Sequence, residues 1–388
     1  MKMNYNPDYP DVESLRERAR KRIPKFAFEY VDGGCNEEVN LVNNTSDIRK
    51  IELKPSYLRD FSAVNLDTNL LGETYSAPFG IAPVGLQGLI WPGSPEIIAQ
   101  AAYDNNIPFI LSTVTTSSIE RIAEITRGKA WFQLYYPADK KVTDNILKRL
   151  ESSGYKVLVL LADVPSFGFR PKEIRNGLAM PPRMTLRNMM QIVSRPDWAI
   201  RTLFHGQPEF ATLKPYMPKG MNMHHLGLFM NKTFNGRLTE EKISYIRERW
   251  KGRLVIKGVV DEADAEKCRR LGADGLIVSN HGGRQLDAGE SAVDSLKRIL
   301  KARNTDMTIM MDSGIRSGPD IARVLASGAS FTFLGRAFMY GVAALGKEGA
   351  SHTIHILKKQ LQQVMEQLSC QDVAELPGHL IKPTSSTN

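Results

Sequence analysis

Short apolar runs recur between residues 77 and 336, and most are continuous rather than alternating between apolar and polar positions. Continuous apolar runs of this length are typical of strands that are covered on both faces, as in a parallel sheet. We predict eight strands, at 78–83, 108–112, 130–136, 156–163, 253–258, 274–280, 307–314 and 330–335.

Stretches with helical periodicity separate these runs. A strand followed by a helix, repeated around eight strands, indicates an α/β fold of the (β/α)8 TIM-barrel type. A doubly wound open sheet is the structural alternative, but the first strand is not followed by a G-x-G-x-x-G turn, which favours closure. The predicted helices lie at 95–105, 118–126, 144–153, 261–272, 292–304 and 318–328.

The segment between the fourth and fifth predicted strands, 183–237, is too long for an ordinary barrel loop. It carries eight basic residues against two acidic ones, a net +6 out of the +9 of the whole chain, and seven of the 15 methionines. Basic residues mixed with methionine and aromatic side chains are typical of a segment that lies on an anionic membrane. A lid that packs on its own barrel is the alternative. The basic residues are Arg183, Arg187, Arg195, Arg201, Lys214, Lys219, Lys232 and Arg237.

Composition narrows the class of protein. Of the 388 residues, 42% are hydrophobic and 24% charged, which is typical of a globular chain, and we expect one domain over 1–388 with 183–237 as an insertion. The longest apolar run, 157–162, is too short to span a bilayer, which takes about 20 residues. The start, MKMNYNPDYP, has no apolar core, so we expect no secretory signal.

Cysteine usage and the placement of charge exclude further classes. Cys35, Cys268 and Cys370 are scattered and odd in number, so we expect neither a disulfide framework nor a metal site. This usage fits a reducing compartment, and we expect a cytoplasmic location. Because the excess positive charge is confined to one segment without a known nucleic-acid motif, we expect no nucleic-acid partner.

Polar side chains gather where the predicted strands end. The carboxyl ends of barrel strands carry the chemistry of TIM-barrel enzymes. The last two strand ends also combine glycines with Arg316 and Arg336, which can hold phosphate oxygens, so the barrel is predicted to bind a phosphorylated ligand. The strand-end residues are Pro83, Val84, Gly85, Ser112, Gln133, Tyr135, Asp163, Lys257, Ser279, His281, Asp312, Ser313, Gly314, Gly335 and Arg336.

The stretch SNHGGRQLD, at 279–287, resembles a motif of the FMN-dependent L-2-hydroxy acid dehydrogenases and oxidases. PKFAFEYVDGG, APFGIAPVGLQG, WFQLYY and MDSGIRSGPDI extend the resemblance over nearly the whole chain. Within that family, LIWPGSP and MDSGIRSG are most similar to (S)-mandelate dehydrogenase, with the bacterial L-lactate dehydrogenases as the next branch. The family fold is an FMN-binding TIM barrel, which agrees with the pattern of strands.

The resemblance implies two catalytic groups. His281 resembles the family's base, and imidazole suits this role because its pKa lies near the working pH. Asp163 resembles the carboxylate that orients this ring and stabilises its protonated form.

The resemblance also implies a site for the substrate carboxylate and hydroxyl. Arg170 and Arg284 resemble the two arginines of that site, and each offers a planar fork that matches a carboxylate. Tyr30 and Tyr135 resemble phenols that bond the substrate.

For the cofactor, Lys257 resembles the lysine beside the flavin ring, where a cation favours the reduced, anionic form. Leu161 departs from the family, which usually has a threonine there that bonds the flavin. Ring contacts are expected from Pro83, Val84, Gly85, Ser112, Gln133 and Ser279, and ribityl and phosphate contacts from Asp312, Ser313, Gly314, Ile315, Arg316, Gly335 and Arg336.

These features together imply that FMN oxidises an L-2-hydroxy acid and that a membrane quinone takes the electrons. Val114, where glycolate oxidases have tryptophan, favours a bulky, mandelate-like acid, and Gly85 favours a dehydrogenase over an oxidase. The alternatives are an L-lactate dehydrogenase and a soluble oxidase that produces hydrogen peroxide. We expect a homo-oligomer, a tetramer by resemblance, placed peripherally on the inner face of the cell membrane through 183–237.

Overall fold

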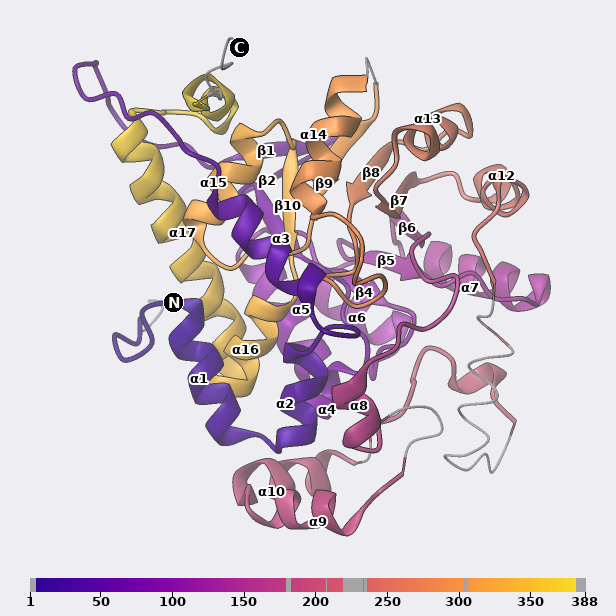
Figure 1. Ribbon diagram of the computed structural model, residues 1–388. Helices are drawn as coiled ribbons and strands as arrows, with labels where there is room; N and C mark the ends of the chain where they lie inside the picture. Colours follow the sequence, from indigo (N-terminus) through magenta and orange to yellow (C-terminus); the bar gives the residue numbers. More distant parts are fainter. Residues whose placement is uncertain are drawn as a thin grey trace.

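The computed structural model describes residues 5–178, 183–206, 208–218, 233, 236–302 and 306–381. Eight parallel strands form one sheet in the order β3-β10-β9-β8-β7-β6-β5-β4, and a bridge between Ile81 and Phe109 joins its two edges. The fold is therefore the predicted α/β TIM barrel (Figure 1). Its strands are β3 Phe79–Ile81, β4 Ile110–Ser112, β5 Trp131–Leu134, β6 Val157–Leu161, β7 Arg253–Val259, β8 Gly275–Val278, β9 Thr308–Met311 and β10 Phe331–Leu334.

A short antiparallel hairpin, β1 Thr68–Leu70 with β2 Glu73–Tyr75, closes the amino-terminal end of the barrel. Its Leu70 and Tyr75 belong to the same buried cluster as inward-facing strand residues such as Trp131 and Phe331. The Trp131 indole also donates to the Tyr75 hydroxyl at 3.3 Å. The hairpin therefore fills the centre of this end of the barrel, and the larger cavity opens at the opposite end.

Helices surround the barrel. The six predicted helices are confirmed as α5, α6, α7, α13, α14 and α15, and side-chain caps begin several of them, as at Ser118, Asp261 and Ser317. The helices are α1 Val12–Arg22, α2 Lys25–Asp32, α3 Val39–Arg49, α4 Gln87–Ile90, α5 Ser94–Asp104, α6 Ile119–Thr126, α7 Lys140–Ser152, α8 Pro171–Arg175, α9 Leu186–Val193, α10 Pro196–His205, α12 Glu240–Arg249, α13 Glu262–Arg270, α14 Ala292–Ala302, α15 Gly318–Ala326, α16 Arg336–Leu345 and α17 Gly349–Leu368, with 3-10 turns η1 Lys214–Tyr216, η2 Gly346–Glu348 and η3 Val373–His379.

The first part of the 183–237 segment forms α9 and α10, which lie together at one edge of the molecule beside α8 (Figure 1). Trp198 anchors α10, since its ring is buried, packs edge-on against Phe26 at 5.9 Å and donates to the Ile90 carbonyl at 3.0 Å. Asp197 also pairs with Arg22 at 2.8 Å. The two helices are thus fixed to the barrel along one face.

The second part of the segment, 208–218, packs over the open end of the barrel. Phe210 and Leu213 are buried against Leu86 and Val114. Arg149 of α7 donates to the Thr212 carbonyl at 3.0 Å. Lys219 and Lys232, two of the basic residues counted in the sequence, lie outside the described residues.

Candidate active site

A cavity of about 660 Å³ opens at the carboxyl ends of the strands, within the size range of small-ligand sites. The structure brings all the predicted site residues to this place. Asp163 and Ser279 lie directly behind residues of its wall. The other predicted residues line it: Tyr30, Pro83, Val84, Gly85, Ser112, Gln133, Tyr135, Arg170, Lys257, His281, Arg284, Asp312, Ser313, Gly314, Ile315, Arg316, Gly335 and Arg336.

The turn after β8 places His281 in the cavity. His281 has a φ of 59°, and Gly282 and Gly283 follow at 64° and 72°. A side chain on Gly283 would meet the Leu41 backbone nitrogen at 2.5 Å, so that position has room only for glycine. A non-glycine residue in this left-handed conformation is strained, and such strain is concentrated at functional sites.

The His281 ring is oriented by a buried carboxylate. Its Nδ1 lies 3.0 Å from Asp163 Oδ1, and because a carboxylate only accepts, Nδ1 carries the proton and Nε2 is left as an acceptor. Burial lowers the pKa of His281 below its usual 6.5 although Asp163 opposes this, and the neutral ring is ready to accept a proton. Burial works against the Asp163 charge too, but His281 and Lys257 outweigh it and keep the pKa of that carboxyl low.

Two arginines face each other beside His281. Arg284 reaches back to α2, where its Nη1 donates to the carbonyls of Tyr30 at 2.8 Å and Gly33 at 2.9 Å. Arg170 is the N-cap residue of α8, and its Nε donates to the Arg284 carbonyl at 3.2 Å. The two arginines therefore come from different loops, and a hydrogen bond from the Arg170 side chain to the Arg284 backbone joins them.

Two residues that the sequence gave no role complete this arrangement. Glu173 of α8 bonds Arg284 Nη2 at 2.6 Å and Arg170 Nη1 at 3.3 Å. Gln285 accepts from Arg170 Nη2 at 3.0 Å and donates to the Asp163 carbonyl at 3.0 Å. Gln285 stands in the SNHGGRQLD stretch, whereas Glu173 lies in RPKEIR, which resembles an ordinary exposed helix start.

Two tyrosines supply hydroxyl groups to the same wall. The Tyr30 hydroxyl donates to the Gly85 carbonyl at 3.3 Å. Burial raises the pKa of Tyr30, and burial together with Asp163 raises the pKa of Tyr135. Both phenols therefore stay protonated, and the Tyr30 hydroxyl would have to turn its one hydrogen from Gly85 to donate to a ligand.

At the floor of the cavity Lys257 is an almost completely buried cation. Its Nζ pairs with Asp312 Oδ2 at 2.9 Å and donates to Ser279 Oγ at 2.7 Å. Burial disfavours the ammonium, but Asp312 and Asp163 outweigh it and hold the pKa of Lys257 above its usual value. The lysine is thus charged at the point where β7, β8 and β9 end.

Arg316 and Arg336 lie at the end formed by β9 and β10. Arg336 is buried and donates to the backbone carbonyls of Val31, Gly282 and Gly33 at 2.8–3.0 Å. Burial and the neighbouring Arg316 lower the pKa of Arg336 to about 9. A bound phosphate dianion would relieve the repulsion between the two guanidinium groups. The glycine-rich strand ends beside them also suit a phosphate site.

Comparisons with known proteins identify the family. The model of the FMN-dependent dehydrogenases matches residues 19–383. The chain belongs to the FMN-dependent dehydrogenase family. It is 37% identical over 362 residues to an L-lactate dehydrogenase of Pectobacterium atrosepticum, covering 93% of this chain and 94% of that one. It is also 37% identical over 366 residues to an L-lactate dehydrogenase of Haemophilus influenzae, covering 94% and 96%.

Solved structures agree with this family. The monotopic membrane protein (S)-mandelate dehydrogenase superposes with a TM-score of 0.91 at 32% identity, covering 97% of this chain and 100% of that one. A mandelate oxidase superposes with a TM-score of 0.82 at 29% identity, covering 96% and 98%. The protein is therefore an FMN-dependent L-2-hydroxy acid dehydrogenase by family.

The residues present fit FMN. Gln133 is buried, and its Nε2 has no protein partner among the described residues while its Oε1 accepts from Ser112 Oγ at 3.2 Å. An unpaired buried amide donor is costly, and an acceptor on a flavin ring would satisfy it. Lys257 would face the same ring, and Arg316 with Arg336 would hold the phosphate. These assignments of single residues remain predictions.

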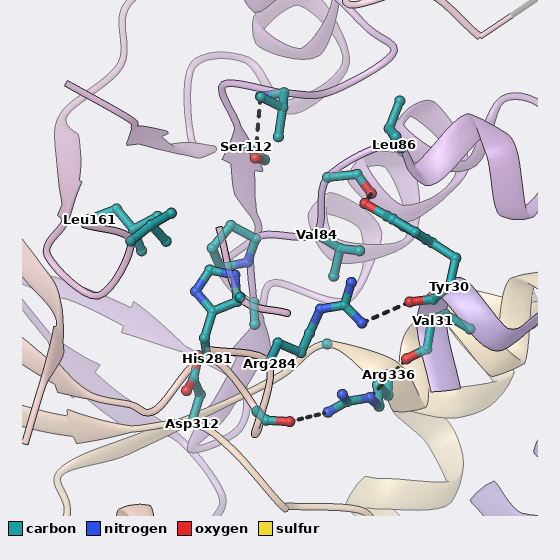
Figure 2. Close-up of a pocket in the computed structure, with 18 of the residues that line it drawn as sticks. Tyr30, Val31, Val84, Leu86, Ser112, Leu161, His281, Arg284, Asp312 and Arg336 are labelled. Carbon is teal, nitrogen blue, oxygen red and sulfur yellow. Dashed lines mark hydrogen bonds between the residues drawn. The ribbon is translucent and has the colours of Figure 1, made fainter. Parts of the chain in front are cut away.

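One wall of the cavity offers the cofactor no hydrogen bond. Leu161 ends β6, is 7% exposed and lines the cavity, so its side chain can only pack against a ligand. Figure 2 shows Leu161 and Tyr30 on opposite sides of the cavity, with His281 between them in this view.

Proposed function

We propose that this protein oxidises a bulky, mandelate-like L-2-hydroxy acid to the 2-keto acid and passes the electrons to a membrane quinone. The observation that carries the oxidation is the neutral His281, oriented by Asp163 at 3.0 Å and facing a cavity that also contains two arginines. Such a base beside a carboxylate site suits removal of a proton from a hydroxy acid.

In the proposed reaction the substrate carboxylate binds Arg170, Arg284 and the Tyr30 hydroxyl. His281 accepts one proton at Nε2, and Asp163 stabilises the imidazolium that results. FMN, when bound, accepts the two electrons removed from the substrate carbon. The same residues serve whether the proton leaves the carbon, giving a carbanion, or the hydroxyl, with transfer of a hydride.

The size of the substrate is inferred from the apolar part of the cavity. Val114, Leu86 and Phe210 line it, and no tryptophan stands at 114 to fill it. Burying a phenyl ring there contributes roughly 25 cal/mol per Å² of apolar surface removed from water. The likeness to mandelate dehydrogenase supports this choice, and the likeness to L-lactate dehydrogenases supplies the alternative.

Anaerobic mixing of FMN-loaded protein with glycolate, L-lactate and (S)-mandelate tests the reaction, with loss of flavin absorbance as the readout. In steady-state assays with an artificial dye as electron acceptor, we expect the highest kcat/KM for mandelate, with lactate second. Lactate in first place would establish the alternative, and glycolate first would refute the argument from size. Rapid oxygen consumption with substrate in air would indicate a soluble oxidase instead.

The membrane part of the proposal is supported by the outer faces of α9 and α10. Leu186, Met189 and Val193 of α9 are more than half exposed and recur at helical spacing on one face. Leu203 and Phe204 of α10 are 80% and 87% exposed. A helix pair that is anchored on one side and apolar on the other is typical of an interfacial segment. No described helix is long and apolar enough to cross a membrane.

The two parts of the segment would then have different tasks. Phe210 lines the cavity and covers the active site, as a lid would, whereas α9 and α10 point apolar side chains away from the barrel. We propose that the protein docks through α9 and α10 on the inner face of the cell membrane. A homo-tetramer, expected from the resemblance, also remains a prediction.

Vesicle binding tests the docking surface. Replacing Leu186, Val193, Leu203 and Phe204 with serine should abolish co-sedimentation with phosphatidylglycerol–phosphatidylethanolamine vesicles, because the apolar area is lost. Reduction of the flavin by substrate should be unchanged, since these side chains point away from the cavity. Serine at Tyr57 and Leu58, which are exposed in another loop, is the matched control and should leave vesicle binding intact. Binding that survives the first set of substitutions would refute docking through this face.

A further inference from the structure

Glu173 is a carboxylate inside the site that is expected to bind a carboxylate. Its side chain is 13% exposed and lines the cavity together with Arg170 and Arg284. Its Oε1 lies 2.6 Å from Arg284 Nη2 and 3.3 Å from Arg170 Nη1. Both arginines are as deeply buried, at 15% and 14% exposed. The three groups form one charged cluster with little access to water.

The hydrogen bonds of Arg284 show how a substrate would share it with Glu173. A guanidinium has five N–H donors. Among the described residues, Tyr30 and Gly33 accept the two from Nη1, and Glu173 accepts one from Nη2. The remaining two donors are Nε–H and the second Nη2–H, which is the number that one carboxylate takes in a bidentate pair. Glu173 can therefore stay in place when a substrate binds.

Counting charge leads to the same result. Two guanidinium groups face one resident carboxylate, so the cluster lacks one negative charge until a monoanion binds. Because these groups are buried, an uncompensated charge is costly in either direction. A second negative charge on the ligand would be repelled by Glu173 at close range.

We propose that Glu173 is a positioning and specificity-determining residue: it holds Arg284 in its orientation and limits the pocket to substrates with one carboxylate. This inference rests on the proposed function, since it concerns how the same site binds an anionic acid. It assigns the 2-hydroxy dicarboxylic acids to the excluded class and the 2-hydroxy monocarboxylic acids to the accepted one.

The test uses oxidised FMN-loaded protein and two ligands of nearly the same shape. Oxalate is a dianion, and oxamate is a monoanion in which an amide replaces one carboxylate. Titration calorimetry gives the ratio of their affinities. In Glu173→Gln we expect this ratio to rise in favour of oxalate by about tenfold or more, because one negative charge beside the ligand is removed.

Two variants serve as controls. Glu173→Asp keeps the charge and should leave the ratio within about twofold of the wild type. Glu37 is exposed and lies next to Asn36, whose backbone N–H donates to the Phe169 carbonyl beside Arg170. Glu37→Gln thus removes a nearby charge that does not contact the arginines, and the ratio should not change. A shift in Glu37→Gln equal to that in Glu173→Gln would overturn the proposal.

A charge-restoring pair keeps the test decisive if Glu173→Gln folds poorly. Arg170→Met leaves one arginine against Glu173, and oxamate affinity should fall at least about tenfold. Arg170→Met combined with Glu173→Gln restores one net positive charge and should recover most of that loss. A merely structural role for Glu173 predicts a further loss in the double variant, and that result would overturn the inference.

These titrations separate the two proposals. If no 2-hydroxy acid reduces the flavin, the proposed function fails, yet the oxalate-to-oxamate ratio still reports on Glu173. If mandelate reduces the flavin but the ratio is the same in Glu173→Gln as in the wild type, the function stands and the role of Glu173 is refuted.

Discussion

Replacing Gly85 with alanine puts a methyl group between the substrate wall and Tyr30. The new Cβ would lie 2.8 Å from Val114 Cγ2 and 3.5 Å from the Tyr30 hydroxyl oxygen. Gly85 is not among the residues of positive φ, so its backbone accepts alanine and the side-chain clash alone decides the outcome. Val114 has to move, and because it is β-branched it has few rotamers to choose from.

The size of the effect follows from this overlap. A contact under 3.0 Å requires a shift of the neighbour, and overpacking of this kind costs about 1–3 kcal/mol. For a chain of 388 residues, unfolding entropy of about 2.1 cal/mol/K per residue converts this loss into a fall in Tm of about 1–4 °C. The displaced Val114 would also enter the cavity, so the KM for mandelate should rise more than the KM for lactate.

A double-mutant cycle with Val114→Ala checks the reasoning. Removing Cγ2 should relieve the strain, so Val114→Ala in the Gly85→Ala background should recover most of the lost Tm and of the mandelate KM. Coupling energies between residues in contact are about 0.5–3 kcal/mol. If the two substitutions are additive in both Tm and KM, the alanine methyl does not press on Val114 and the argument is wrong.

Three further predictions concern the buried charges and the flavin wall. Lys257→Met leaves the Asp312 carboxylate without its cation, which should cost about 3–5 kcal/mol of stability and lower the Tm by about 4–6 °C. Adding Asp312→Asn to this variant should restore most of the lost Tm. An unchanged Tm in Lys257→Met would contradict the pairing. Asp163→Asn removes the carboxylate that raises the pKa of His281. The acid limb of the pH profile of kcat/KM lies below pH 6.5 in the wild type, and it should move to still lower pH in this variant. The kcat should fall as well. A shift of the acid limb to higher pH would contradict the claim that Asp163 raises the pKa of His281. Leu161→Thr should tighten FMN binding about two- to tenfold, because the threonine hydroxyl can add one neutral hydrogen bond to the flavin. Flavin fluorescence measures this affinity. An unchanged affinity would show that the wall is packed around leucine.

The barrel could be predicted because each strand is buried on both faces. Runs such as 156–163 are then continuously apolar, and the structure has β6 at Val157–Leu161 within that range. The amino-terminal helices α1, α2 and α3 were not predicted, because none of them follows a predicted strand: α1 and α2 pack against α16, and α3 packs against α14 and α15. The β1–β2 hairpin escaped because each of its strands has only three residues.

The candidate site could be predicted where a motif of adjacent residues carries it. His281 and Arg284 are three positions apart, and their distinctive neighbours make the stretch specific. Glu173 and Gln285 could not be assigned from sequence, because their roles depend on contacts with residues more than 100 positions away, such as Glu173 with Arg284. A Glu in a charged helix start is usually solvated, and only the structure shows that this one is buried between two arginines.

The structure also joins the proposed membrane face to the substrate site through α8. Asn188 of α9 donates to the Asn176 carbonyl at 2.9 Å, and Asn176 is the C-cap of α8, the helix that contains Glu173 and has Arg170 as its N-cap. Asn176 in turn donates to Glu29 of α2, the helix that also carries Tyr30. The buried amide side chains of Asn188 and Asn176 therefore hold the arginine cluster and the apolar helix pair in one rigid unit. Because these hydrogen bonds join the two, a protein docked through α9 would present its cavity to the membrane in a defined orientation, as the proposed delivery of electrons to a quinone requires.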